Sequence, residues 1–215
     1  MPTLQPDELP EFMRRLSVAS VRNSTRHLVQ WQLHTMVRPN EAAGTRWEEI
    51  DFESALWVIP ASRMKKRKAH TVPLTLQTLA ILEQMKPISG HREFVFPGER
   101  NPRTHINRQT ANMVIRRMGY TGELVAHGLR AIASTSLNEQ GFDPDVIESA
   151  LAHTDRNEVR AAYNRAEYLQ RRRVMMDWWS NFIDAAAEGV STRTGTRNLR
   201  LLHNEETLQC APSVP

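Results

Sequence analysis

The sequence predicts a mainly α-helical fold with one small antiparallel three-stranded β-sheet, an α+β domain. Three observations lead to this prediction. Apolar residues recur at helical spacing before residue 36 and again after residue 75. Between Trp47 and Leu74, three short runs rich in β-branched and aromatic residues stand close together. Helical patterns with recognisable caps then follow one another to about residue 187.

Two helices are expected before the sheet. The first begins at Pro6-Asp7-Glu8, because Pro suits the first helical position and acidic side chains are favoured near a helix N-terminus. The second runs from about Ser24 to Met36, where Val29, Leu33 and Met36 lie on one helical face. Pro39 then ends the helical structure or restarts it.

The sheet is expected from three runs, at Ile50 to Phe52, Leu56 to Ile59, and Thr71 to Leu74. The segment Arg63 to Lys68, in which five of six residues are basic, connects the last two runs. This arrangement favours an antiparallel hairpin with a charged turn.

The helices after the sheet are recognised by N-capping side chains and by Gly or Pro at their ends. They are expected from Thr75 to the Pro87–Gly90 region, from Asn107 to Met118, from Gly128 to Gln140, from Asp143 to Leu151, and from Glu167 to Ala187. Residues 189–215 are rich in Ser, Thr, Arg, Asn and Pro and are expected to form a flexible C-terminal tail.

Composition excludes several classes of protein. The chain has 215 residues, of which 40% are hydrophobic and 24% charged, so it is neither wholly disordered nor larger than about one domain. The longest apolar run, Ala55 to Ala61, is too short to span a bilayer, and no secretory signal is apparent, so a cytoplasmic location is expected. The single cysteine, Cys210, excludes a disulfide scaffold and a Cys-based zinc site. Neither a carboxylate cluster suited to Mg²⁺ nor a phosphate loop is present in the sequence, so no metal and no other cofactor is predicted.

Two basic features precede residue 70. Arg38 follows an apolar helix, and a guanidinium matches a phosphate with two parallel hydrogen bonds. Glu41, three residues on, could hold that guanidinium from the same helical face, although Arg38 could also be an ordinary surface charge. The second feature is the basic turn, whose side chains could enter a DNA groove, deliver a proton, or only protect a sheet edge. Its basic residues are Arg63, Lys65, Lys66, Arg67 and Lys68.

Two further features follow residue 120. His127 and Arg130 are three apart at the start of a helix, so both could contact one phosphate, or they could be a chance pair. His153 follows Leu151-Ala152, and Tyr163 comes ten residues later. Alternatively, His153 simply ends a helix, and Tyr163 and Tyr168 are half-buried packing residues.

Taken in chain order, these features resemble the catalytic domain of the tyrosine recombinases, and especially the integrases of temperate phages and genomic islands. The resemblance covers about Pro6 to Asp184 and implies the fold of that DNA breaking-rejoining domain. All six catalytic positions of the family hold the expected residue type. They match Arg38 in Val-Arg-Pro-x-Glu, Lys65 eight residues before Pro73, His127, Arg130, His153, and Tyr163 in Ala-Ala-Tyr-Asn-Arg-Ala.

The resemblance implies a role for each of these residues in site-specific recombination of double-stranded DNA, without metal or ATP. Tyr163 is the nucleophile that forms a 3′-phosphotyrosyl link, and Arg38 and Arg130 bind the non-bridging oxygens. Lys65 is the general acid. His127 is the base or proton relay, and His153 donates a hydrogen bond to the phosphate. Glu41 supports the site, while Arg63, Lys66, Arg67 and Lys68 are expected to contact DNA.

The resemblance also implies a domain organisation. Residues 1–188 correspond to the catalytic domain, and the N-terminal core-binding and arm-binding domains of the family are expected to be absent. The full-length proteins are expected to act as a homo-oligomer, a tetramer, on DNA attachment sites in the bacterial cytoplasm. Three alternatives remain open: a nicking-closing enzyme like the type IB topoisomerases, a DNA-binding fragment without catalysis, and a helical interaction module.

Overall fold

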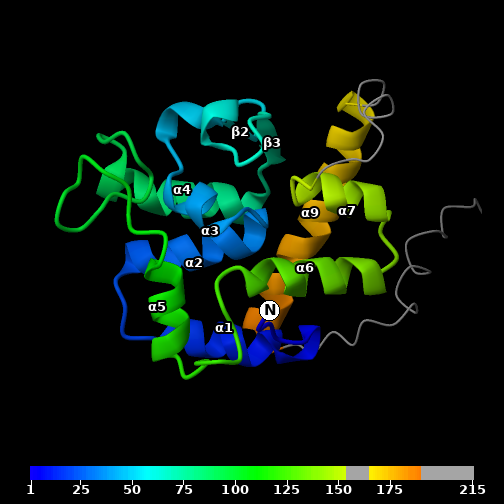
Figure 1. The fold of residues 1–215 in the computed structure, drawn as a ribbon, viewed down its shortest axis with the longest axis horizontal. Coiled ribbons are helices and arrows are strands. Elements are labelled where there is room, and N and C mark those ends of the chain that lie inside the picture. Colours follow the sequence, from blue (N-terminus) through cyan, green and yellow to red (C-terminus); the bar gives the residue numbers. More distant parts are fainter. Residues whose placement is uncertain (154–164, 190–215) are drawn as a thin grey trace, which may run out of the picture.

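The computed structural model describes residues 1–153 and 165–189 of the chain, and Figure 1 draws its ribbon. It has the predicted mainly α fold with a small sheet. The described helices are α1 (Leu9–Val18), α2 (Asn23–Thr35), α3 (Pro39–Ala43), α4 (Leu76–Ser89), α5 (Thr110–Arg117), α6 (Gly128–Glu139), α7 (Pro144–Ala150) and α9 (Arg165–Ala187). The strands are β1 (Ile50–Asp51), β2 (Leu56–Ile59) and β3 (His70–Pro73), and 3₁₀ turns cover Pro6–Glu8, Trp47–Glu49 and Ala61–Arg63.

The central strand of the sheet is β2, which pairs antiparallel with β1 on one side and with β3 on the other. Because side chains alternate along a strand, Trp57 and Ile59 are buried while Val58 between them is exposed. His70 opens β3 directly opposite Ile59, and its side chain is also buried. The exposed basic turn that connects β2 to β3 is thus followed, at the first residue of β3, by a buried histidine.

The core joins the sheet to the helices through large aromatic side chains. In Figure 1, α9 runs through the middle of the molecule, where it packs against α1, α2, α6, α7 and β3. The indole N–H of Trp179 on α9 donates to the carbonyl of Leu33 at 2.8 Å. Trp31 of α2 and Trp57 of β2 have ring centroids 5.2 Å apart, a contact worth about 0.5–1.5 kcal/mol beyond the burial itself. These contacts fix α2, the sheet and α9 relative to one another.

Several predicted helix ends are confirmed by their capping contacts. The side chain of Thr75 accepts a hydrogen bond from the backbone N–H of Thr78 at the start of α4. Asp143 caps α7 in the same way, by accepting from the N–H of Asp145 at 2.8 Å. Gly141 ends α6 with a positive φ of 83°, a conformation that Gly adopts without strain.

Three details of the prediction are wrong. Phe52 lies in the turn after the two-residue strand β1, where its ring stacks on that of Trp47. Pro87 does not close α4 but lies inside its last turns, on the exposed face. Asn107 does not start α5: its side chain accepts from the N–H of Gln109, and the helix begins only at Thr110. The expected tail lies outside the described residues from position 190 onward.

Candidate active site

The candidate site is built around the backbone turn that follows α7. Ala152 has a positive φ of 50°, and its N–H donates to the carbonyl of Ser149, while the N–H of His153 donates to the carbonyl of Glu148. This is the Schellman arrangement, which turns the chain sharply after a helix. It leaves the carbonyls of Leu151 and Ala152 for partners from other elements and directs His153 toward the same place.

Arg130, from the first turn of α6, joins two helix ends. Its guanidinium donates to the carbonyl of Met36 at the end of α2, at 2.5 Å, and to that of Leu151 at the end of α7, at 2.6 Å. Helix C-termini carry partial negative charge, so both contacts stabilise the cation. The residue is only 4% exposed, and burial, followed by the nearby Arg38, lowers the pKa of Arg130 to about 10. The guanidinium therefore stays charged at neutral pH.

Arg38 lies beside Arg130 and reaches the next carbonyl of the same turn. Its guanidinium donates to the carbonyl of Ala152 at 3.3 Å and to the carboxylate of Glu41 at 3.0 Å. The other oxygen of that carboxylate accepts the backbone N–H of Arg38 at 2.9 Å, so Glu41 caps α3 and orients the side chain at once. The structure therefore brings the two predicted arginines together on adjacent carbonyls and gives Glu41 the predicted contact.

His153 completes the described part of this cluster. Its Nε2 lies 3.3 Å from the guanidinium of Arg130, and its Nδ1 lies 2.8 Å from the carboxylate of Glu148. A guanidinium can only donate, so Nε2 accepts and Nδ1 carries the proton that bonds to Glu148. Glu148 is five residues before His153 and reaches it only because the chain turns after α7, which explains why helical spacing in the sequence did not reveal it.

His127 belongs to the same electrostatic environment. It occupies the N-cap position of α6 and is exposed. Partial burial of the imidazole, followed by the charges of Arg130 and Arg38, lowers the pKa of His127. These cations disfavour a further positive charge, so the imidazole is neutral at neutral pH and available to accept a proton.

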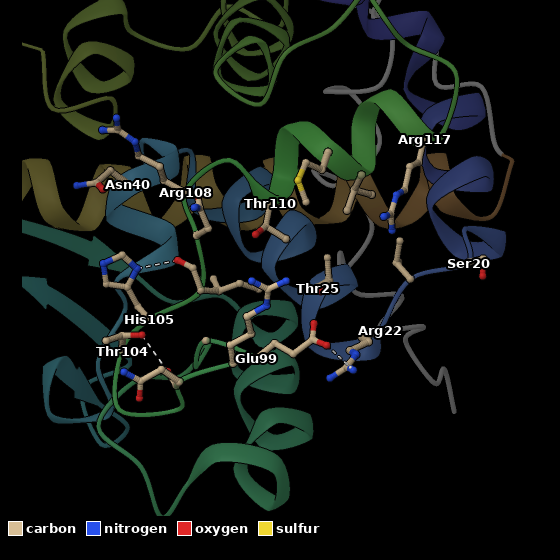
Figure 2. A pocket seen from close by; sticks show the side chains of 18 residues that line it. Ser20, Arg22, Thr25, Asn40, Glu99, Thr104, His105, Arg108, Thr110 and Arg117 are labelled. Carbon is tan, nitrogen blue, oxygen red and sulfur yellow. Dashed lines mark hydrogen bonds and ion pairs between the residues drawn. The ribbon is translucent and has the colours of Figure 1, made fainter.

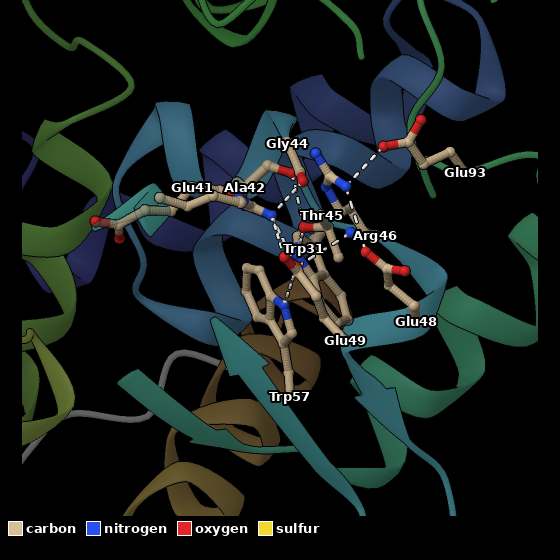
Figure 3. Close-up of polar contacts among 11 residues, drawn as sticks. Trp31, Glu41, Ala42, Gly44, Thr45, Arg46, Glu48, Glu49, Trp57 and Glu93 are labelled. Atoms are coloured by element: carbon tan, nitrogen blue, oxygen red, sulfur yellow. Dashed lines mark hydrogen bonds and ion pairs between the residues drawn. The ribbon is translucent and has the colours of Figure 1, made fainter. Parts of the chain in front are cut away.

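Arg63 differs from the rest of the basic turn because its guanidinium points inward. It forms an ion pair with Glu49 at 2.7 Å and donates to the backbone carbonyls of Glu41, at 2.9 Å, and Gly44. Glu49 also accepts from the indole of Trp57 at 3.0 Å, and Figure 3 shows this polar cluster. These contacts favour a structural part for Arg63, which ties the hairpin to α3, over the DNA contact that the sequence predicted.

The other basic residues of the turn, Lys65, Lys66, Arg67 and Lys68, are exposed. Lys65 makes no hydrogen bond or ion pair within the described part of the chain, and no described contact joins it to Arg38 or Arg130. The chain reverses at Arg67, which has a φ of 50° and donates its N–H to the carbonyl of Met64. The structure thus presents these side chains to the surroundings of the protein.

A broad basic hollow, which the sequence did not reveal, lies between α5, the start of α2 and the loop that carries residues 98–108. Figure 2 shows the side chains that line it, and its volume is about 1140 Å³. Asn40, two residues after Arg38, is part of its lining, whereas neither Arg38 nor Arg130 is. One acid, Glu99, is present and pairs with Arg22 at 2.6 Å. The basic residues of the lining are Arg22, Arg100, His105, Arg108 and Arg117.

Three further predictions concern the nucleophile, a metal site and a membrane span. Tyr163 lies outside the described residues. Within the described ranges, His, Cys, Asp and Glu side chains do not gather into a group of three that could hold a metal ion. Every helix of the described chain is too short or too polar to cross a bilayer.

Comparison with known proteins identifies the family. A profile described as the phage integrase family matches residues 2–170. The chain belongs to the phage integrase family. It is 54% identical over 202 residues to "Prophage integrase IntA" of Escherichia coli K12, covering 94% of this chain and 49% of that protein. It is 40% identical over 199 residues to the "Integrase" of Enterobacteria phage P4, covering 85% and 45%. This member of the family therefore spans about half the length of the curated relatives it matches.

Solved structures of integrases and recombinases share the fold. The integrase from mycobacterium phage Brujita superposes with a TM-score of 0.62 at 20% identity, over 85% of this chain and 63% of that one. The XerH site-specific recombinase bound to its difH substrate superposes with a TM-score of 0.60 at 19% identity, over 74% of this chain and 49% of that one. The family resemblance and the fold class that the sequence predicted are both confirmed.

Two buried residues near the cluster escaped sequence reasoning. His70 lies within electrostatic reach of Arg172, Arg130 and Arg38. Arg172 of α9 is itself buried and donates to the carbonyl of Thr71, the neighbour of His70 in β3. In the sequence, His70 directly precedes the predicted strand from Thr71 to Leu74, and Arg172 is part of a run of three arginines, so neither had a local signal.

Proposed function

We propose that this chain cleaves and rejoins double-stranded DNA by transesterification, with Tyr163 as the nucleophile and a 3′-phosphotyrosyl intermediate. One observation supports this most directly. The guanidiniums of Arg38 and Arg130 are bound to the adjacent carbonyls of Ala152 and Leu151, and His153 contacts Arg130. Two fixed cations next to a histidine suit a phosphodiester whose charge increases during the reaction.

The two arginines bind the non-bridging oxygens of the cleaved phosphate. In the transition state these oxygens gain negative charge, and donors that are already in position stabilise it without rearrangement. Arg130 meets this requirement because the carbonyls of two helix ends hold its guanidinium. Arg38 meets it because the carboxylate of Glu41 holds its guanidinium. A lysine at either position would supply charge without the paired geometry.

Proton transfer accompanies the exchange of bonds. The phenol oxygen of Tyr163 forms a bond to phosphorus as the bond from phosphorus to the 5′ oxygen breaks. A free tyrosine has a pKa of about 10, so its proton must leave during attack, and neutral His127 is the acceptor. Lys65 donates a proton to the departing 5′ oxygen. Reversal of these steps with a new 5′ hydroxyl rejoins the strand.

DNA is held by the exposed basic turn at residues 66–68 and by the basic hollow, whose rim at Asn40 lies next to Arg38. Residues 1–188 act as the catalytic domain, and the biological reaction is the integration or excision of mobile DNA by a tetramer. The integrase relatives and a DNA-bound recombinase with the same fold support this assignment. Such a protein works in the bacterial cytoplasm, where the chromosome is.

The test uses a nicked half-site from which the cleaved fragment diffuses away, so that the covalent adduct accumulates. We expect the wild-type chain to form an adduct that resists SDS and Tyr163→Phe to form none. Tyr168→Phe is the matched control, because it removes a phenol hydroxyl five residues away and should leave the adduct unchanged. Equal adducts from wild type and Tyr163→Phe would disprove the assignment of the nucleophile.

A further inference from the structure

The turn after α7 is bound by basic side chains at three consecutive residues. Arg38 binds the carbonyl of Ala152, Arg130 that of Leu151, and His70 contacts the backbone of Ala150. The last carbonyls of a helix have no partner within the helix, so they must be satisfied from outside. Here the partners come from the start of α3, from α6 and from β3, so this turn joins three separate elements of the fold.

His70 is the member of this set that connects the turn to the sheet. It is 7% exposed and pairs with Ile59 across the β2–β3 ladder, so its backbone cannot move independently of the sheet. Its Nε2 finds no hydrogen-bond partner among the described residues, so its contact with Ala150 is made through Nδ1. Burial, followed by the charge of Arg172, lowers the pKa of His70 to about 3, so the imidazole is neutral.

A second buried side chain binds the same strand. Arg172 of α9 is buried and donates to the carbonyl of Thr71. Residue 70 of β3 is thus bound to α7, and residue 71 is bound to α9. The contact of His70 with Ala150 therefore links the α7 turn directly to the sheet.

We propose that His70 is a positioning residue for DNA cleavage, which holds the α7 turn at the place where its carbonyls align the guanidiniums of Arg38 and Arg130 on the cleaved phosphate. This inference depends on the function proposed above. His70 touches neither DNA nor the reacting atoms. It acts because the two guanidiniums take their positions from Leu151 and Ala152, which directly follow the residue that His70 contacts.

The test compares two substitutions of His70 in single-turnover cleavage of the half-site. His70→Leu removes the contact, whereas His70→Asn keeps an N–H at the position of Nδ1. Because a small misplacement near the reacting atoms costs up to about 100-fold, we expect His70→Leu to lose roughly 10- to 100-fold in rate and His70→Asn to recover most of it. DNA affinity should stay within about twofold of wild type for both, since no phosphate contact is removed.

His34→Leu is the matched control. His34 is buried to a similar degree, but its Nδ1 bonds to Ser180 of α9, so its replacement leaves the contact between His70 and the α7 turn in place. We expect this variant to lower the midpoint of thermal unfolding as much as His70→Leu while it cleaves DNA at the wild-type rate. If His70→Leu and His70→Asn are equally slow, or if His34→Leu is as slow as they are, the effect is general destabilisation and the proposal is wrong.

A modified substrate provides a second readout. Replacing one non-bridging oxygen of the cleaved phosphate by a methyl group removes the charge that the arginines bind. A residue that acts through these arginines should then matter less, so the ratio of wild-type to His70→Leu rates should fall toward one. An unchanged ratio would overturn the role of His70 while adduct formation by wild type still supported the proposed function. Absence of any wild-type adduct would overturn both.

Discussion

Replacing Glu41 by Gln tests whether the orientation of Arg38 depends on a buried carboxylate. Glu41 is 3% exposed, and its two oxygens accept the backbone N–H of Arg38 at 2.9 Å and its guanidinium at 3.0 Å. A glutamine keeps one acceptor but presents an amide N–H where the second was. It also leaves the guanidinium, whose side chain is 19% exposed, without a counter-charge. The substitution therefore disturbs Arg38 without removing it.

The magnitude follows from the environment of the pair. Removing one member of a fully buried ion pair costs about 3–5 kcal/mol. Here the loss is smaller, because Arg38 is partly exposed and still reaches the carbonyl of Ala152. We therefore expect the free energy of unfolding to fall by about 1–3 kcal/mol. We expect the single-turnover cleavage rate to fall by about 10- to 100-fold, because a displaced catalytic group is costly.

The assays are urea denaturation and adduct formation on the nicked half-site. Glu48→Gln is the control, because Glu48 is also a paired glutamate, but its side chain is 71% exposed and lies 3.3 Å from Arg46. That variant should change stability by less than about 0.5 kcal/mol and leave cleavage unchanged. If Glu41→Gln cleaves as fast as Glu48→Gln, Arg38 does not need Glu41 and this part of the site is wrongly explained.

Three further predictions concern other parts of the chain. Replacing residues 66–68 by Ala should weaken DNA binding and reduce the slope of log affinity against log salt by about 0.9 for each phosphate that these side chains neutralise, and an unchanged slope would contradict their role. Ala152→Gly should raise the free energy of unfolding by about 1 kcal/mol, because a left-handed backbone is strained for Ala, and a lower urea midpoint would refute this. Burial lowers the pKa of His34 to about 4 and that of His70 to about 3, so their stabilisation is complete above the unfolded value of about 6.5 and is lost as pH falls. At pH 5 each histidine should lower the free energy of unfolding by about 2 kcal/mol relative to pH 7.5, and a urea midpoint that does not fall would contradict this prediction.

Local patterns were sufficient to predict most of the fold. The strand from Leu56 to Ile59 and the caps at Thr75 and Asp143 occur as expected, because their signals lie within a few residues of one another. Phe52 was wrongly assigned to a strand, because that assignment also relied on a local signal alone. Its aromatic character suits a strand, but contact with Trp47 holds it in a turn.

The arrangement of the site could be predicted only in part. The sequence identified Arg38 and Arg130, but their partners are carbonyls at helix ends that come together only on folding. Arg63 looked like its basic neighbours because the sequence does not show that Glu49 is placed to draw it inward. His70 had no signal at all, since its neighbours belong to α6, α7 and α9.

The central claim is that a phosphate held by Arg38 and Arg130 is transferred to Tyr163. The most direct measurement is to digest the wild-type DNA adduct with nuclease and protease and to locate the remaining nucleotide by tandem mass spectrometry. We predict a single modified peptide with the nucleotide on the phenol oxygen of Tyr163. A nucleotide on Tyr168, on a serine or on a histidine, or a cleaved strand with no protein attached, would contradict the account.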